Sequence, residues 1–193
     1  MILVAITGTI CSGKSFISKI IERLGYPIFS CDEEIYKILK QKSTLKKISL
    51  EFPQVVSRNE VNKKKLAEII FENLRSKQQI EAMLYPKLFD KQNKFIAGLE
   101  KKKARISFFE VPLLYEKNLE DQYSCVITTC AGENILANRA TNRKIDQKVF
   151  CNILKNQLSS KEKEDRADYV INTDCSKMEV ENKIKKIINE ILK

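Results

Sequence analysis

The sequence predicts an α/β fold built on a doubly wound parallel sheet of about five strands. Short, nearly continuous apolar runs, which are typical of parallel strands buried on both faces, alternate along the chain with segments of helical character. The first apolar run, residues 1–7, leads through a glycine-containing loop into an amphipathic helix. Helices that separate buried strands in this way indicate a doubly wound sheet.

The predicted elements follow the same two patterns in order along the chain. The strands are expected at residues 1–7, 27–30, 105–109, 125–128 and 169–172. The helices are expected at about 15–24, 32–39, 133–142 and 146–158, with a helix-rich middle at about 44–99 and a terminal helix after residue 176. Gly25 ends the first helix, and a capping box of Ser176 and Glu179 opens the last one. We expect breaks in the middle segment at Pro53 and near Pro86.

The length of 193 residues predicts a single domain that can bury a core of its own. Within it, the strands place the core at residues 1–32, 104–132 and 167–193. A helix-rich region is expected at about 33–103, and a polar pair of helices at about 133–163.

Composition excludes several classes of chemistry. The chain has no histidine, which removes Ser-His, Cys-His and His-ligated metal mechanisms. Its six cysteines include no C-x-x-C pair, so no zinc site is expected. The sequence shows neither a membrane span nor an export signal, and we therefore expect a cytoplasmic protein with reduced cysteines.

The formal net charge of +10 favours an anionic partner. The charges are spread along the chain and no nucleic-acid-binding motif accompanies them, so small polyanions such as nucleotides are favoured over nucleic acid. A biased, lysine-rich composition is the alternative explanation of the same charge.

The loop after the first strand reads GTICSGKS and fits the phosphate-loop pattern G-x-x-x-x-G-K-[ST]. Its glycines allow tight turns that point backbone N–H groups at phosphates, and the following helix adds its positive end. Lys14 can reach the β- and γ-phosphates, and the Ser15 hydroxyl can ligate Mg²⁺. We therefore expect a nucleoside triphosphate to bind the whole loop: Gly8, Thr9, Ile10, Cys11, Ser12, Gly13, Lys14 and Ser15.

The residues that act on the γ-phosphate are less constrained by position. Asp32 follows the second strand, where a carboxylate can take the proton from an attacking hydroxyl or can N-cap the next helix, and both roles remain open. Arg139 and Arg143 lie four residues apart on one helical face. They can stabilise charge on the transferred phosphoryl group or form a solvated basic face.

Nearly the whole chain resembles the dephospho-CoA kinase family of phosphate-loop kinases. The segments that carry the resemblance are ITGTICSGKS (the opening loop), SCDEEIYKIL (the D-A-D motif), VNKKKLAEIIF and MLYPKL (before and at the L-H-P motif), EVPLLYE (V-P-L-L-[FV]-E), NRATNR (the paired arginines) and NQLSSKEKEDRADYVINTD (the closing segment). The phosphate loop alone would indicate only a superfamily, whereas VPLLYE together with RADYVIN is far more specific.

The resemblance implies transfer of phosphate from ATP, with Mg²⁺, to the ribose 3′-hydroxyl of dephospho-CoA, which gives CoA and ADP as the last step of coenzyme A biosynthesis. It implies a phosphate-loop NTP hydrolase fold with a helical lid at about 133–163 and an acceptor-binding insertion at about 33–103. No nucleic-acid or membrane partner is expected, and the chain is expected to be a monomer or a weak oligomer.

The resemblance also assigns roles to single residues. Asp32 matches the second aspartate of D-A-D, the expected base, and Arg139 matches the lid arginine expected near the transferred phosphoryl group. Lys14 is expected to act in catalysis with them, and Arg143 to help hold ATP. The expected substrate contacts are Asp32, Tyr85, Leu113 and Glu116.

Some positions depart from the family pattern. Ser30 replaces the first aspartate of D-A-D, and Asn62 with Lys63 replaces an Asp-Arg pair. Tyr85 replaces the histidine of L-H-P, and a tyrosine can still position a substrate by hydrogen bonding and stacking. Glu110 ends a predicted strand, where a carboxylate that organises magnesium can lie.

Two other functions remain open. One is a related small kinase that acts on a nucleoside monophosphate or on shikimate. The other is a phosphate-loop switch or a nucleic-acid-binding ATPase that uses the basic surface. A guanine-specific switch would need an N-K-x-D-like motif, and the sequence contains none.

Overall fold

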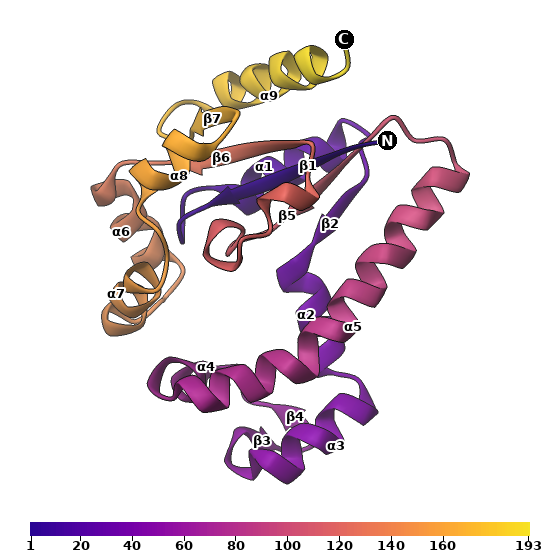
Figure 1. The fold of residues 1–193 in the computed structure, drawn as a ribbon. Coiled ribbons are helices and arrows are strands. Elements are labelled where there is room, and N and C mark those ends of the chain that lie inside the picture. The colour runs from indigo at the N-terminus through magenta and orange to yellow at the C-terminus, as the bar shows by residue number, and fades with distance from the viewer. The chain divides into compact units, whose positions relative to one another are not determined.

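The computed structural model describes the backbone of residues 1–193 and the side chains of residues 1–70 and 73–193. The chain divides into two compact units, which Figure 1 colours along the sequence. The first unit contains residues 1–30 and 100–193, and the second contains residues 31–99. The second unit thus begins and ends within a few residues of the helix-rich region expected from the sequence.

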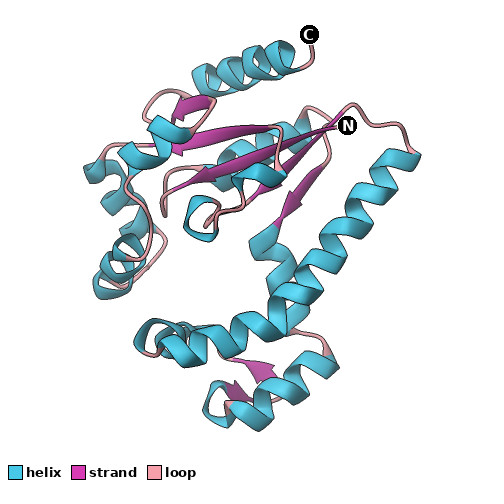
Figure 2. Ribbon diagram, in the orientation of Figure 1, coloured by secondary structure: helices cyan, strands magenta, loops and turns pink.

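The first unit is built on a five-stranded parallel sheet (Figure 2). Its strands are β1 (Ile2–Gly8), β2 (Ile28–Ser30), β5 (Ile106–Glu110), β6 (Cys125–Cys130) and β7 (Tyr169–Asn172). They lie in the order β2-β5-β1-β6-β7, and every neighbouring pair is parallel. The later strands therefore lie on both sides of β1, with β2 and β5 on one side and β6 and β7 on the other, which confirms the predicted doubly wound sheet.

Helices α1 (Lys14–Arg23) and α9 (Lys177–Ile191) pack on one face of this sheet, and α8 (Ser160–Arg166) packs against β6 and β1. Helices α6 (Glu133–Asn142) and α7 (Gln147–Lys155) pack on each other beyond the strand ends, and the connection after β5 contains the 3-10 turns η2 (Tyr115–Lys117) and η3 (Glu120–Gln122). The predicted helix at 146–158 is shorter in the structure, because a second capping box, formed by Ser159 and Glu162, starts α8 as a separate helix. The capping box at Ser176 opens α9 as expected.

The core of the first unit lies between the sheet and the pair α1 and α9. Alternate residues of β1, Val4 and Ile6, point into it and are fully buried. They pack against isoleucines of both helices: Ile17, Ile20, Ile21, Ile184, Ile187 and Ile188. Because each strand end is fixed by this packing, the loops that follow β1, β5, β6 and β7 meet at one edge of the sheet.

The second unit is mainly helical. It contains α2 (Cys31–Leu39), α3 (Lys42–Glu51), the 3-10 turn η1 (Pro53–Val55), the hairpin strands β3 (Val56–Ser57) and β4 (Glu60–Val61), α4 (Lys63–Glu72) and most of α5 (Leu74–Lys101). The hairpin was not predicted; its two-residue turn places Arg58 and Asn59 in the left-handed region, with φ of 51° and 59°. Lys91 of α5 forms an ion pair with Glu34 of α2 at 2.8 Å.

The expected break near Pro86 is wrong, because α5 runs through this residue as one helix of 28 residues. Proline removes one hydrogen bond of the helix, but Leu84 and Leu88 on either side of Pro86 are buried and hold both turns in place. Within the described residues, neither α5 nor any other helix is long and apolar enough to cross a membrane.

A buried ion pair ties α8 to the connection after β5. The ammonium of Lys163, which is fully buried, lies 2.8 Å from Glu116 Oε1 and donates to the carbonyl oxygen of Pro112 at 3.2 Å. Glu116 Oε1 also accepts the backbone N–H of Leu158 at 2.9 Å. Burial lowers the pKa of Lys163, and the carboxylate of Glu116 opposes this shift.

Replacement of Lys163 by methionine tests this pair. Lys163→Met should lower the free energy of unfolding by about 3–5 kcal/mol, because it leaves the Glu116 carboxylate largely buried without its cation. Lys161→Met on the same helix is the control, since Lys161 pairs with Asp165 at the surface and should contribute about 1 kcal/mol or less. If urea unfolding shows an equally small loss of stability in both variants, the pair of Lys163 and Glu116 does not brace α8.

Candidate nucleotide-binding site

The loop between β1 and α1 is a tight turn that depends on two glycines. Gly8 and Gly13 have backbone φ angles of 142° and 103°, values that residues other than glycine rarely adopt. A Cβ atom on Gly8 would lie 2.4 Å from the carbonyl oxygen of Thr129 on β6. The loop therefore packs directly against the neighbouring strand.

The ammonium group of Lys14 lies inside this turn. Lys14 is only 9% exposed, and its Nζ donates to the carbonyl oxygens of Gly8 at 2.9 Å and of Thr9 at 2.8 Å. These bonds hold the positive charge at the start of the loop, where the motif places the β- and γ-phosphates.

Side chains from β6 and from the loop after β7 brace the turn. The hydroxyls of Ser12 and Thr129 share a hydrogen bond of 2.6 Å. Thr173, which follows β7, donates from Oγ1 to the carbonyl oxygen of Ser12 at 2.8 Å. A turn held from two sides is preorganised for a ligand.

Arg139 of α6 reaches the same place. It donates from Nη1 to the carbonyl oxygen of Cys11 at 3.2 Å and to Thr173 Oγ1 at 2.8 Å, and from Nη2 to the carbonyl oxygen of Thr173 at 2.9 Å. The structure thus brings Arg139 to the phosphate loop, and its predicted role at the transferred phosphoryl group stays a prediction. Arg143, at the C-cap of α6, is exposed.

Glu110 adds a buried carboxylate beside the loop. It ends β5, is 4% exposed, and accepts hydrogen bonds from Ser15 Oγ at 2.9 Å and from Ser18 Oγ at 2.7 Å. Its place at the end of an apolar strand was the only signal in the sequence. The pairing of β1 with β5 aligns Glu110 with Ile6, two residues before Gly8.

Two further contacts were missed by the sequence analysis. The backbone N–H of Ile10 donates to Gln157 Oε1 at 2.9 Å, which links the loop to the connection between α7 and α8. The second missed contact is that of Thr173, which bonds to Ser12 of the loop and to Arg139. Neither residue lies in a spacing pattern with the loop, so no local signal marks them.

The match to a family model decides what kind of site this is. The model of dephospho-CoA kinase matches residues 2–179 of the chain. The chain belongs to the dephospho-CoA kinase family. It is therefore a kinase that uses ATP.

Similar proteins agree with this assignment. A dephospho-CoA kinase of Bartonella henselae is 30% identical over 194 residues, which cover 100% of both chains. The solved dephospho-CoA kinase from Campylobacter jejuni is 27% identical, with a TM-score of 0.69 over 98% of this chain and 96% of that one. The solved protein TT1252 from Thermus thermophilus has a TM-score of 0.83 over 98% and 97% of the two chains; at 24% identity it supports the fold alone.

Asp32 and Tyr85 belong to the second unit. Asp32 is exposed and is the second residue of α2, which begins one residue earlier than predicted, so Asp32 is not the N-cap of this helix. Tyr85 donates from its hydroxyl to Glu81 Oε1 at 3.1 Å, and burial is the main cause that raises its pKa.

Of the two residues expected from the VPLLYE segment, Glu116 is held by Lys163 and by the N–H of Leu158, and Leu113 is half-buried. Asn62, which replaces a family aspartate, N-caps α4 by accepting the N–H groups of Lys64 and Lys65. Asparagine caps a helix about as well as aspartate, so the capping of α4 does not need a carboxylate at this position.

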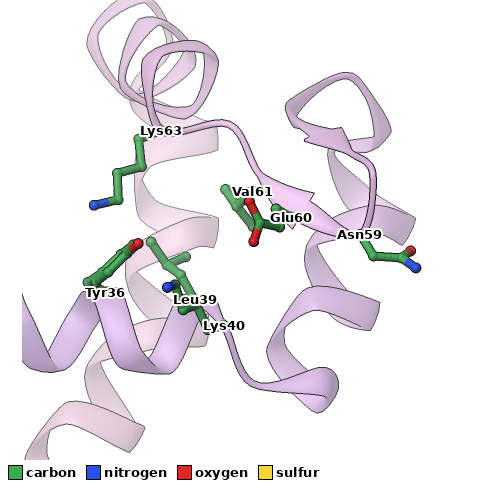
Figure 3. Close-up of a pocket in the computed structure, with 7 residues that line it drawn as sticks. All are labelled: Tyr36, Leu39, Lys40, Asn59, Glu60, Val61 and Lys63. Atoms are coloured by element: carbon green, nitrogen blue, oxygen red, sulfur yellow. The ribbon is translucent and has the colours of Figure 1, made fainter.

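The second unit has a cavity of its own, of about 590 Å³ (Figure 3). Two lysines approach the ring of Tyr36 there: the Nζ of Lys63 lies 3.4 Å from the ring centroid and that of Lys40 4.3 Å. A hydrogen bond with Lys40 is the main cause that lowers the pKa of Tyr36. Glu60 is the acidic residue of the lining.

Removal of the Lys14 ammonium should abolish most activity with little effect on folding. Contacts of this kind to the reacting phosphate contribute about 3–4 kcal/mol, so Lys14→Ala should lower kcat/KM by roughly a hundred- to a thousandfold. Lys19→Ala, at an exposed position of α1, is the matched control and should keep the parent rate. Near-normal turnover by a folded Lys14→Ala variant would show that the loop does not hold the reacting phosphate.

Proposed function

We propose that the chain transfers the γ-phosphoryl group of ATP to the ribose 3′-hydroxyl of dephospho-CoA, giving CoA and ADP. The observation that carries this proposal is the braced phosphate loop, with Lys14 and Arg139 on it, in a chain matched by the family model over residues 2–179. The loop binds the phosphates of ATP through backbone N–H groups and Lys14. Arg139 is placed to stabilise charge on the oxygens of the transferred group.

Asp32 is the proposed base. In the reaction, the 3′-oxygen gives its proton to the Asp32 carboxylate and forms a bond to the γ-phosphorus, while the bond from this phosphorus to the bridging oxygen breaks and ADP leaves. Support comes from the chain path: Ser30, the last residue of β2, pairs in register with Glu110, and Asp32 follows two residues later. The position of Asp32 inside α2 removes the capping role as an alternative.

The residues beside the loop fit Mg²⁺. A hydroxyl and a buried carboxylate, from Ser15 and Glu110, lie within hydrogen-bond distance of each other, and both are oxygen ligands of the kind this ion prefers. When bound, Mg²⁺ neutralises phosphate charge during transfer. Ser15 would hold the ion, and Glu110 would orient the Ser15 hydroxyl.

We assign acceptor binding to the second unit. The cavity at Tyr36, with Lys40 and Lys63, offers positive charge to an anionic acceptor, and Tyr85 offers a hydroxyl and a ring. Leu113 and Glu116 remain proposed substrate contacts of the first unit, and Arg143 a proposed ATP contact.

Residues 133–163 are the proposed lid, which would exclude water when both substrates are bound. Hydrogen exchange of this segment should slow on addition of both substrates, and unchanged protection would show a rigid face.

We also propose that the chain is a monomer, since all the assigned groups lie on one chain, and that it is located in the cytoplasm, where ATP is available. The elution volume in size-exclusion chromatography tests whether the chain is a monomer.

An assay of ADP release with ATP and Mg²⁺ tests the acceptor. Dephospho-CoA should be turned over well above AMP, CMP, shikimate and pantetheine, because only it would match both the loop and the proposed acceptor site. Faster turnover of another acceptor would mean that the chain is a related kinase of different specificity. Hydrolysis stimulated by DNA or RNA would instead support a nucleic-acid-dependent ATPase.

Replacement of Asp32 by asparagine tests the proposed base. Asp32→Asn should lower kcat by about a hundred- to ten-thousandfold, because the amide cannot accept the proton. ATP binding and stability should change little, since the phosphate loop is untouched. Glu33→Gln removes a neighbouring exposed carboxylate of the same helix and should leave kcat near that of the parent. If Asp32→Asn stays within about threefold of the parent, Asp32 is not the base.

A further inference from the structure

The peptide group between Thr9 and Ile10 of the phosphate loop is held from both sides. Its carbonyl oxygen, that of Thr9, accepts the Lys14 ammonium at 2.8 Å and the backbone N–H of Ser12 at 3.2 Å. Its N–H, that of Ile10, donates to Gln157 Oε1 at 2.9 Å. One peptide unit thus carries the charged group of the motif on one side and a distant side chain on the other.

The geometry of a peptide links these two contacts. In a trans peptide the C=O and N–H bonds lie in one plane and point in opposite directions, and the described residues include no cis peptide. Rotation of this group would therefore turn the Thr9 carbonyl away from Lys14 and the Ile10 N–H away from Gln157 at the same time. A side chain that holds the N–H also holds the carbonyl at the lysine.

The backbone at Gln157 is itself anchored. Gln157 follows α7, and its own N–H donates to the carbonyl oxygen of Leu154 at 3.1 Å. The next N–H, that of Leu158, donates to Glu116 Oε1 at 2.9 Å, and the same oxygen lies 2.8 Å from the fully buried Lys163 ammonium. The Gln157 side chain therefore reaches the loop from a fixed base and can set the position of the peptide.

A neutral amide suits this place. A backbone N–H only donates, so the oxygen of the Gln157 amide, and not its NH2 group, faces Ile10. A lysine or an arginine would offer no acceptor atom, and a carboxylate would add negative charge beside the loop that binds the phosphates. Glutamine supplies the acceptor without the charge.

We propose that Gln157 is a positioning residue for Lys14. Its amide oxygen fixes the peptide between Thr9 and Ile10, and the Thr9 carbonyl in turn holds the ammonium where it meets the β- and γ-phosphates of ATP. This inference rests on the proposed role of Lys14 at the reacting phosphate. It deepens that role by adding a residue 147 positions away in the sequence, which acts through the loop and not on a substrate.

Removal of the amide oxygen tests the proposal. Gln157→Leu keeps a side chain of similar size but has no acceptor, so kcat should fall about tenfold or more, because a small displacement of a catalytic group is costly. KM for dephospho-CoA should stay within about twofold of the parent. Gln157→Glu keeps an acceptor oxygen and should retain most of kcat, while its added charge raises KM for ATP.

The matched control is Asn156→Leu. It removes an amide at the neighbouring exposed position, where the side chain donates to the carbonyl oxygen of Asn152 within α7. Its kcat should stay near that of the parent. Exchange of the Ile10 backbone amide, followed by NMR, should quicken in Gln157→Leu and stay slow in Asn156→Leu, which tests the contact without any reaction.

A double-mutant cycle separates positioning from a structural role. In the Lys14→Ala background, Gln157→Leu should change kcat/KM for ATP by less than about twofold, because no ammonium is left to position. Loss of a contact that only supports the fold would lower the rate by the same factor in both backgrounds.

Three results would overturn the proposal. Equal fold losses with and without Lys14 would show that Gln157 does not act through the ammonium. Parent-like kcat in a folded Gln157→Leu variant would show that the loop keeps its shape alone. Tighter ATP binding in this variant would mean that the side chain competes with a phosphate for the Ile10 N–H. Failure of the proposed function is seen separately, as a parent enzyme that prefers another acceptor, and the cycle is then run with that acceptor.

Discussion

The contact between the phosphate loop and β6 is the constraint on which the rest of the site depends. Gly8 lies so close to Thr129 that no side chain fits between them. This approach lets the chain turn sharply at the end of β1, which in turn places the Lys14 ammonium against the carbonyl oxygens at the start of the loop. A larger residue at position 8 would push the loop away from the strand and displace this charge.

The neighbouring strands complete the site because the sheet fixes where their ends lie. In the parallel order β2-β5-β1-β6-β7, the carboxyl ends of β5 and β6 flank that of β1. Glu110 thereby reaches Ser15, and Thr173, after β7, reaches the far side of the loop. Arg139 then docks on Thr173 through neutral oxygens, so its positive charge remains available to a phosphate. Residues from four distant segments thus meet at the phosphate loop.

The sequence predicted those features that local physics determines. The apolar runs gave all five strands, since strands buried on both faces need continuous apolar residues. The phosphate loop and the Ser176 capping box were found because their function requires fixed residues at fixed spacing. The α/β fold could therefore be deduced before any coordinates.

The features that the sequence missed depend on tertiary contacts. Pro86 does not break α5, because burial of the leucines beside it outweighs one lost hydrogen bond. Gln157 and Thr173 reach the loop only through the fold, so no spacing reveals them. The roles of Asp32 and Tyr85 remain predictions. Both residues belong to the second unit, whereas the phosphate loop belongs to the first.

A titration of ATP with two glycine variants tests the central constraint most directly. Gly8 and Gly25 both have positive φ, but a Cβ atom on Gly8 would meet Thr129, whereas one on Gly25 would meet nothing within 4 Å. Both variants should therefore lose some stability from backbone strain, and only Gly8→Ala should lose the ATP site. Calorimetry should show ATP binding with Mg²⁺ weakened by at least about a hundredfold in Gly8→Ala and unchanged in Gly25→Ala. Parent-like ATP affinity in a folded Gly8→Ala variant would contradict the account.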